Sequence, residues 1–189
     1  MSAKPPVKPT IKRWLPGDPD PADQVKRMVR VDHAGEHGAA RIYEGQLAIL
    51  GKRPVGETIR HMAAQEREHR AVFDKLLVER RVRPTLLGPV WDMAGYALGA
   101  ATALMGERAA MACTVAVEEV IDEHYQEQVD ALGDSEPALK AVIEKFQADE
   151  REHRDTGLAH GAEAAPAYEA LSAAIKFGSR LAIWMATRI

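Results

Sequence analysis

Hydrophobic side chains recur every three to four residues over most of the chain, which is the period of an amphipathic α-helix. Glycine and proline divide this pattern into six segments. Asp20-Pro21 is typical of a helix cap followed by proline in the first turn, and Gly51 ends the helix that they begin. Asp134 or Ser135 is placed to cap the fifth segment. We therefore predict an all-α fold with helices over about 20–51, 54–81, 86–105, 107–132, 134–160 and 166–189.

Four of these helices contain charged residues inside an otherwise apolar stripe. The stripes are Val29, Glu36, Ala40, Tyr43 and Leu47; Ile59, Met62, Glu66, His69, Phe73 and Leu76; Met111, Val115, Glu118, Ile121 and Tyr125; and Leu139, Ile143, Phe146, Glu150 and His153. A stripe of this kind faces the core of a helical protein. We therefore expect a four-helix bundle in which the charged side chains converge, with two additional hydrophobic or amphipathic helices at 86–105 and 166–189.

The charged residues belong to an internal repeat. The sequence Glu-Arg-Glu-His-Arg occupies positions 66–70 and again 150–154, and each copy contains Glu-x-x-His, which places both side chains on one helix face. Glu36 precedes the first copy by 30 residues, and Glu118 precedes the second by 32. A tyrosine follows each of these glutamates by seven residues, at Tyr43 and Tyr125. This spacing indicates a duplicated helical hairpin, with the third helix as the crossover.

Two helices that each donate Glu and two that each donate Glu-x-x-His form the ligand set of di-iron and di-manganese carboxylate bundles. Burying an unpaired carboxylate costs several kcal/mol, so four together need compensating charge, which two divalent cations supply. A set of oxygen and nitrogen donors without sulfur favours iron or manganese over tetrahedral zinc. We predict six metal ligands, namely Glu36, Glu66, His69, Glu118, Glu150 and His153. The metal centre that they hold would also be the catalytic centre.

Other polar residues near the repeat are open to two interpretations. His33, one turn before Glu36, either supports a metal ligand by a hydrogen bond or is an ordinary packed or exposed histidine. Tyr43 and Tyr125 either pack in the core or line the site as proton or electron relays. Glu68 and Glu152 lie away from the ligand face, and we expect them either in solvent or paired with nearby arginines. We expect His37, His61 and His160 at the surface. A charged seam in a metal-free bundle is the alternative for the whole set.

Length and composition limit the remaining choices. With 189 residues, we expect one domain over 20–189, preceded by a flexible proline-rich arm over 1–19. The net charge of −3 gives no indication of nucleic-acid binding. A single cysteine, Cys113, excludes an internal disulfide and a Cys-rich metal site, and its neighbours predict that it is buried. We find neither an uninterrupted apolar segment long enough to span a membrane nor a secretory signal, and the prolines of the arm disfavour a mitochondrial presequence.

Several longer motifs resemble the demethoxyubiquinone hydroxylases of ubiquinone biosynthesis, over about residues 25–189. They are Val31-Asp32-His33-Ala34-Gly35-Glu36, Arg83-Pro84-Thr85, Ala112-Cys113-Thr114-Val115-Ala116-Val117-Glu118-Glu119 and Ala165-Pro166-Ala167-Tyr168. The resemblance implies a ferritin-like bundle with two iron ions and an O₂-dependent monooxygenase that hydroxylates the ring of a polyprenyl demethoxyubiquinol. It also implies that Glu36 and His69 are terminal ligands of one iron, that Glu118 and His153 are terminal on the other, and that Glu66 and Glu150 bridge them.

The resemblance further implies NADH as the ultimate electron source, although the chain has no Gly-x-Gly-x-x-Gly motif. Reduction through the quinone, through another kind of NADH contact or by a separate reductase all remain open. A polyprenyl substrate requires membrane contact, for which we expect the apolar segment 86–106 and the last helix. Gly95-x-x-x-Gly99 permits close helix packing and leaves a homodimer open. We expect a peripheral protein on the cytoplasmic side of a bacterial inner membrane, and a lipid-binding partner that delivers substrate is open.

Two other functions compete with the hydroxylase. A ferritin-like iron store or peroxide scavenger uses related carboxylate sites but needs a polar outer surface, which the segment 86–106 would not provide. The rubrerythrin type of scavenger also needs a Cys-rich module, and this chain has one cysteine. A metal-free scaffold would hold no iron and would lose little stability on Glu66→Ala. Radical chemistry of the ribonucleotide-reductase type is disfavoured by the short chain.

Overall fold

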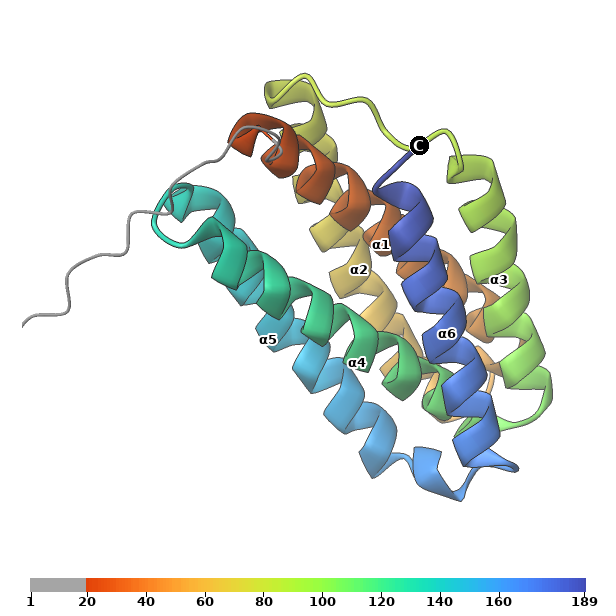
Figure 1. Ribbon diagram of the computed structural model, residues 1–189. Helices are drawn as coiled ribbons and strands as arrows, with labels where there is room; N and C mark the ends of the chain where they lie inside the picture. The colour runs from red at the N-terminus through yellow and green to blue at the C-terminus, as the bar shows by residue number, and fades with distance from the viewer. Residues whose placement is uncertain (1–19) are drawn as a thin grey trace, which may run out of the picture.

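The computed structural model describes residues 20–189, and the predicted arm over 1–19 lies outside the described residues (Figure 1). Residues 20–189 form six α-helices, one short 3₁₀ helix and no strand. The helices are α1 (Pro21–Leu50), α2 (Val55–Glu79), α3 (Gly88–Leu104), α4 (Glu107–Leu132), α5 (Pro137–Ala159), η1 (Ala162–Ala164) and α6 (Tyr168–Ala186). The predicted all-α, ferritin-like architecture is confirmed.

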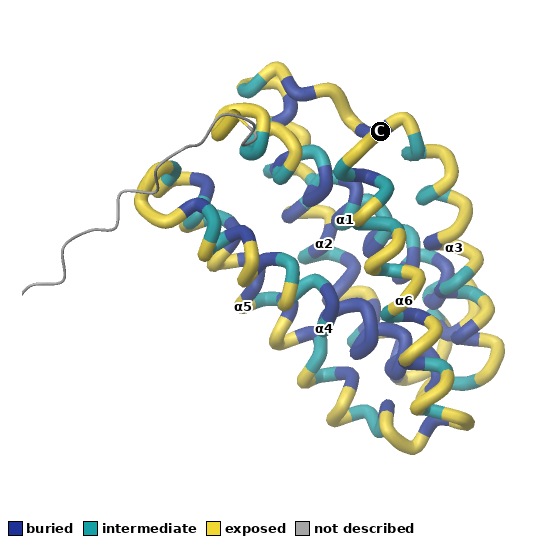
Figure 2. Tube along the Cα trace, in the orientation of Figure 1, coloured by how far each residue is buried: buried dark blue, intermediate teal, exposed yellow. Residues whose placement is uncertain are grey.

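The four helices with charged stripes form the bundle. α1 packs against α2 and α4 against α5, while α3 lies along α1 and α6 along α4 (Figure 1). Buried positions follow the facing sides of α1, α2, α4 and α5, whereas α3 and α6 have long exposed sides (Figure 2). The first half of α4, from Ala109 to Val117, is buried throughout, because neighbouring helices pack on several of its sides. The predicted crossover and added helix therefore form an outer layer beside the bundle.

Local sequence signals explain most helix ends. The Asp20 carboxylate accepts a hydrogen bond from the Ala22 amide at 2.8 Å, which confirms the predicted cap of α1. The predicted cap of α5 is wrong. Its N-cap residue is Glu136, because the Ser135 hydroxyl instead donates to the Leu132 carbonyl at 2.6 Å and satisfies the end of α4. α6 begins at Tyr168 rather than Pro166, after Ala167 in a left-handed conformation with φ of 51°.

Glycine residues bring α1 and α3 into backbone contact. A Cβ atom added at Gly99 would lie 1.9 Å from the Ile42 carbonyl oxygen, and one at Gly95 would lie 2.8 Å from that of Gly38. α1 contributes Gly45, where a Cβ would lie 2.2 Å from the Tyr96 carbonyl oxygen. Gly95-x-x-x-Gly99 therefore faces α1 of the same chain, so this motif is not available as a dimer contact.

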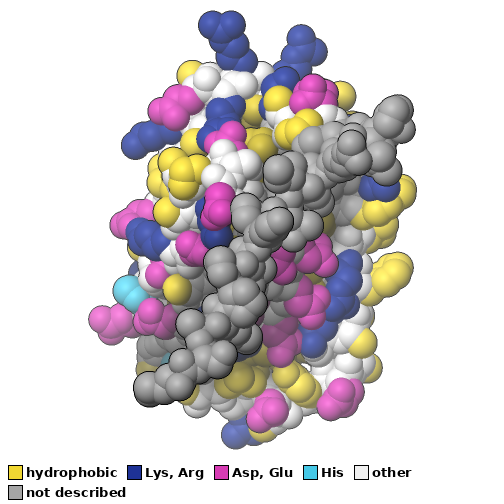
Figure 3. All heavy atoms as spheres, turned by 60° about the vertical axis from the view of Figure 1, so that its left-hand side comes forward, with side chains coloured by type: hydrophobic (Ala, Val, Ile, Leu, Met, Phe, Trp, Pro, Cys, Tyr) yellow, Lys and Arg dark blue, Asp and Glu magenta, His cyan; other side chains and the backbone are white. Residues whose placement is uncertain are grey.

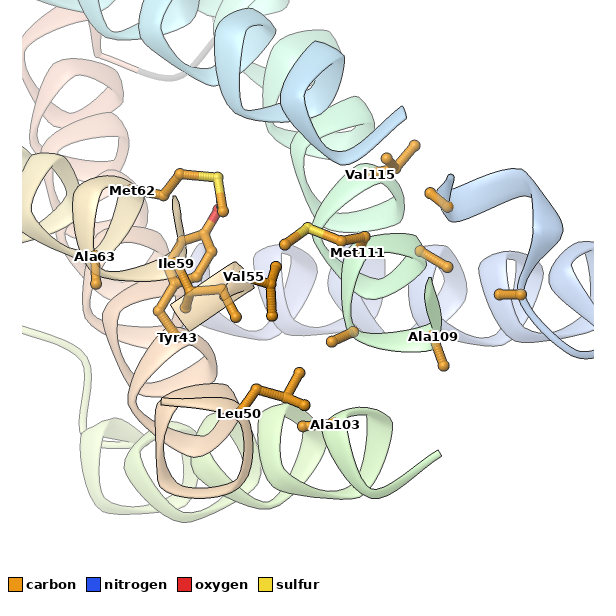
Figure 4. Close-up of a cluster of buried hydrophobic side chains, with 14 residues drawn as sticks. Tyr43, Leu50, Val55, Ile59, Met62, Ala63, Ala103, Ala109, Met111 and Val115 are labelled. Carbon is orange, nitrogen blue, oxygen red and sulfur yellow. The ribbon is translucent and has the colours of Figure 1, made fainter. Parts of the chain in front are cut away.

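Two apolar clusters occupy the ends of the bundle. One combines the C-terminal part of α1 with the N-terminal parts of α2 and α4, including Tyr43, Ile59 and Met111 (Figure 4). The other joins the opposite ends of these helices to the start of α5, including Phe73 and Ile143. The charged residues of the stripes lie at positions between these clusters along each helix. The bundle therefore shields its polar centre at both ends.

Candidate metal centre

All six predicted ligands converge in the middle of the bundle. α1 contributes Glu36, α4 contributes Glu118, and α2 and α5 each contribute a Glu-x-x-His pair. None of the six is more than 3% exposed. Their backbone positions follow from the helical period, because residues three apart lie on one face of α2 and of α5. The structure thus brings together every residue that the repeat predicts.

Ligand atoms of these residues form two overlapping groups. Glu36, Glu66, His69 and Glu150 offer atoms within 4.8 Å of one another, and so do Glu66, Glu118, Glu150 and His153. Glu66 and Glu150 belong to both groups. Two cations that share two carboxylates would therefore fit this arrangement, and each would have one further carboxylate and one imidazole of its own.

The two imidazole rings present the same nitrogen to the carboxylates. His69 Nδ1 lies 3.1 Å from Glu150 Oε1 and 3.4 Å from Glu36 Oε2. His153 Nδ1 lies 3.1 Å from Glu150 Oε2 and also 3.1 Å from Glu66 Oε1. Both Nδ1 atoms therefore point into the cluster, where a metal ion would replace the proton that a metal-free ring shares with the carboxylates.

The pKa values of the buried carboxylates and histidines show how strongly the cluster requires positive charge. Burial and the charge of Glu150 raise the pKa of Glu36, Glu66 and Glu118. Burial alone would lower the pKa of His69 and His153, but hydrogen bonds with the carboxylates outweigh it and raise each to about 11. The chain therefore compensates its buried carboxylates by retaining protons, and bound cations would do so in their place.

Several inward-facing atoms lie beside other polar atoms of the cluster but form no well-aligned hydrogen bond within residues 20–189. They include Glu36 Oε2, Glu66 Oε1 and His69 Nδ1, all of which face the cluster. Buried polar atoms are normally paired, so unpaired atoms that converge from three side chains indicate a missing common partner. Together with the donor set of four carboxylates and two imidazoles, this fits a pair of iron or manganese ions.

Both tyrosines of the repeat hydrogen-bond to a glutamate of the other half. The Tyr43 hydroxyl donates to Glu118 Oε1 at 2.9 Å, and the Tyr125 hydroxyl donates to Glu36 Oε1. Figure 4 shows Tyr43 beside Met62 in the apolar cluster that borders the site. Burial raises the pKa of both phenols well above their usual value, so each remains a donor at neutral pH.

The other residues considered from sequence do not join the ligand groups. His33 Nε2 lies 2.9 Å from Asp74 rather than beside Glu36. Glu68, Glu152 and His61 are exposed, as predicted. His37 and His160 are partly exposed and join neighbouring helices: His37 pairs with Asp92 at 3.3 Å, and His160 pairs with Glu107 at 3.3 Å.

Sequence reasoning missed the residues that hold the histidines from outside. His69 Nε2 lies 3.0 Å from Asp149 Oδ2, and His153 Nε2 lies 3.0 Å from Gln65 Oε1. Each partner immediately precedes the glutamate of the opposite Glu-x-x-His. That shared place in the repeat was the only signal in the sequence that could have identified them.

Buried Asp32 was also missed as a polar group near the site. It accepts a hydrogen bond from Gln128 at 2.6 Å and lies 3.4 Å from His124. Burial raises the pKa of Asp32, against the opposing effect of His124. Asp32 precedes Glu36 by one helical turn and lines a small cavity of about 20 Å³ together with Glu36, Glu66, Glu118 and Glu150.

A larger apolar pocket adjoins this small cavity. It has a volume of about 320 Å³ and lies between α1, α3, α4 and α6. The two cavities share lining residues, namely Val31, Gly35, Ala39, Ile121 and Ile183. A Cβ atom added at Gly38 or Gly178 would meet nothing within 4 Å, so the absence of side chains at these positions widens the pocket. The buried polar cluster and the apolar pocket therefore adjoin one another.

Comparison with known proteins identifies relatives across nearly the whole chain. Residues 23–186 match the family described as ubiquinone biosynthesis protein COQ7. A 3-demethoxyubiquinol 3-hydroxylase of Rhodospirillum rubrum is 60% identical over 181 residues, covering 95% of this chain and 85% of that protein. The human mitochondrial NADPH-dependent 3-demethoxyubiquinone 3-hydroxylase is 51% identical over 169 residues, covering 87% of this chain and 78% of its own length.

A less similar relative also matches most of the chain. The mitochondrial 5-demethoxyubiquinone hydroxylase of Saccharomyces cerevisiae is 42% identical over 180 residues, covering 86% of this chain and 77% of that protein. These relatives are hydroxylating oxidoreductases by name, which confirms the prediction of an enzyme of this kind. The chain therefore belongs to the COQ7 family of ubiquinone biosynthesis proteins.

Proposed function

We propose that the chain is a di-iron, O₂-dependent monooxygenase that hydroxylates the ring of a polyprenyl demethoxyubiquinol. The observation that supports this most strongly is the contact between the six-residue cluster and the apolar pocket. A metal site that only stored iron would need no apolar space beside it, whereas an enzyme acting on a prenylated ring requires both. The names of the relatives support the same substrate class.

In this proposal Glu36 and His69 would hold one iron, Glu118 and His153 would hold the other, and both ions would share Glu66 and Glu150. When bound, the two ions supply the activation of O₂. One oxygen atom replaces a ring hydrogen as hydroxyl and the other leaves as water, so the reaction consumes two electrons and two protons. NADH or a reductase is the ultimate source of the electrons.

The surrounding side chains provide the positioning and the protons. Tyr125 lines the small cavity and donates to Glu36, so its hydroxyl is placed to relay a proton at the Glu36 carboxylate. The residues shared by the two cavities are small or aliphatic, which lets a flat ring approach the cluster and excludes water from it.

The pocket is too small to contain a long prenyl tail. Its volume of about 320 Å³ lies near the lower end of the range of roughly 300–1,000 Å³ for small-molecule sites. We therefore propose that the ring and the first part of the tail occupy the pocket, while the rest leaves between α3 and α6.

The outer surfaces of α3 and α6 suit such an exit. The face of the molecule in Figure 3 mixes acidic and basic side chains. In contrast, most exposed large hydrophobic residues belong to α3, its flanks and α6, namely Leu86, Val90, Met93, Tyr96, Leu104, Met105, Phe177, Leu181 and Trp184. Among residues 20–189, no helix is long and apolar enough to cross a bilayer. We propose peripheral contact through α3 and α6 with the cytoplasmic side of a bacterial inner membrane.

A flotation assay tests the membrane contact. The wild-type protein is expected to float with anionic liposomes, and Phe177→Ser with Leu181→Ser should reduce its binding because both side chains are exposed. The matched control is Val78→Ser, an exposed apolar residue on α2. A wild-type protein that ignores liposomes but hydroxylates a soluble quinol analogue would refute this part of the proposal.

A single-turnover reaction tests the activity itself. Iron-loaded protein is reduced without oxygen, mixed with a short-chain demethoxyubiquinol and exposed to ¹⁸O₂. We expect mass spectrometry to find one labelled oxygen on the ring. Oxygen uptake with ferric mineral and unchanged quinol would instead indicate an iron store.

A further inference from the structure

The outer hydrogen bonds of the two histidines break the symmetry of the site. Two inner features are shared by the halves, because each tyrosine donates to the glutamate of the opposite half and each histidine points Nδ1 at the carboxylates. Glu150 alone lies beside both histidines. The outer partners differ in charge, because His69 meets the carboxylate of Asp149 whereas His153 meets the neutral amide of Gln65. Both contact distances are 3.0 Å, so the two contacts differ in the charge of the acceptor and not in length.

The surroundings of the rings reinforce this difference. Phe146 stacks on His69 with centroids 3.9 Å apart and an interplanar angle of 26°. The residue 84 positions before Phe146 is Met62, so the repeat offers no aromatic ring at the equivalent place beside His153. Tyr43 approaches His153 only edge-on, at 6.1 Å. The orientation of His69 is thus fixed by both a carboxylate and a stacked ring.

A charged acceptor changes what an imidazole offers to a metal. A carboxylate that accepts the Nε2 hydrogen holds that hydrogen on Nε2 and increases the electron density at Nδ1, the nitrogen that would bind the metal, whereas an amide does so less. Asp149 also adds a negative charge close to one of the two ligand groups. Since loss of such outer partners typically lowers metal affinity by about 10–100-fold, one carboxylate is enough to separate the two positions.

We propose that Asp149 is a positioning residue that makes the metal position of Glu36 and His69 bind first and more tightly than that of Glu118 and His153. This inference rests on the metal centre of the proposed function, but it concerns the order and strength of loading. It assigns to Gln65 the opposite role, that of keeping the second position weaker. Loading would then proceed through a defined one-metal state.

Anaerobic titration of the full chain with Fe²⁺, followed by calorimetry, tests the proposal. We expect the wild type to bind in two steps whose dissociation constants differ by about 10–100-fold. Asp149→Asn keeps the size of the side chain and should weaken the tighter step until the two steps merge. Gln65→Glu should strengthen the weaker step. The control is Asp155→Asn, on the same helix but exposed and paired with Arg154, and it should leave both steps unchanged.

The double variant Asp149→Asn/Gln65→Glu distinguishes this role from a merely structural one. It should restore two separated steps with their order exchanged. Adding His69→Ala should then remove the tight step from the wild type but the weak step from the double variant. Mössbauer spectra at one ⁵⁷Fe per chain should show one dominant site in the wild type and a mixture in Asp149→Asn.

The outcomes separate this inference from the proposed function. Two equal steps in the wild type, or an unchanged tight step in Asp149→Asn, would overturn the inference while leaving a metal enzyme. A wild-type chain that binds no Fe²⁺ would overturn both.

Discussion

At the residue scale, Glu150 differs from the other three buried glutamates. Burial would raise its pKa, but hydrogen bonds with His153 and His69 outweigh that effect and lower it. Its two oxygens each lie 3.1 Å from a different histidine. Like Glu66, Glu150 belongs to both ligand groups, but its lowered pKa means that it remains charged more readily than Glu36, Glu66 or Glu118.

Replacing Glu150 with alanine should abolish activity. The loss should exceed about 100-fold, the upper range for residues that act only through a ligand, because both ligand groups lose a member. Iron per chain, measured after gel filtration, should fall with turnover. Glu152→Ala is the matched control, since Glu152 belongs to the same five-residue motif but is exposed. Full activity in Glu150→Ala would refute the ligand assignment.

The two tyrosines allow a paired test of the proposed relay. Tyr125 lines the small cavity beside the glutamates, whereas Tyr43 does not. Both Tyr→Phe changes remove a hydrogen bond to a buried carboxylate, which costs about 1–3 kcal/mol of stability. We expect Tyr125→Phe alone to slow turnover and to change its solvent isotope effect. Equal turnover in the two variants would argue against a relay.

At the scale of elements, a glycine of α3 and a glycine of α6 have different structural effects. Gly99 of α3 allows backbone contact with α1, whereas Gly178 of α6 leaves open space in the apolar pocket. The same residue type therefore serves packing in one helix and a binding space in the other.

Substitutions at these glycines should have different effects. Gly99→Ala should destabilise the protein by about 1–3 kcal/mol or more, because its Cβ would overlap the Ile42 carbonyl. Gly178→Leu should leave the melting temperature and the iron content unchanged but prevent hydroxylation by filling the pocket. Thermal denaturation, iron analysis and turnover together check this pair. An active Gly178→Leu variant would show that the ring does not use this pocket.

The elements also show how far sequence could predict this molecule. Helix limits were predictable where one residue determines them, as at Asp20 and Gly51, and the convergence of the six charged residues was predictable because the repeat duplicates them. The role of Ser135 was not, because the ends of α4 and α5 compete for its hydroxyl. The pairings of Asp149 and Gln65 were missed because they join separate helices. The spacing of the repeat does not show which side chain of one half contacts which side chain of the other half.

At the scale of the whole molecule, the cluster links stability to pH. The pKa values of His69 and His153 rise from 6.5 to about 11, and those of Glu36, Glu66 and Glu118 are also raised. A group whose pKa is higher in the folded chain stabilises it fully below the unfolded value, and this stabilisation disappears as pH rises through the folded pKa. The lowered pKa of Glu150 acts in the opposite direction at acid pH.

The metal-free protein should therefore lose stability as the pH rises from about 6.5 towards about 11, the pKa values of His69 and His153 in the unfolded and folded chain. The free energy of unfolding should fall by about 1.4 kcal/mol per pH unit for each excess proton that the folded chain retains. Loading with Mn²⁺ should remove most of this dependence, because the cations displace those protons. Chemical denaturation of both forms across this range checks the prediction. A metal-free protein that is more stable at pH 9 than at pH 7 would contradict it.

The hydrogen bonds that cross between the two halves have a consequence for synthesis. A ribosome produces α1 and α2 long before α5, yet each histidine relies on a residue of the opposite half, and both ligand groups need Glu150. The unfinished chain thus cannot form either complete ligand group. In the proposed metal enzyme, neither metal position would be complete before α5 has been synthesised.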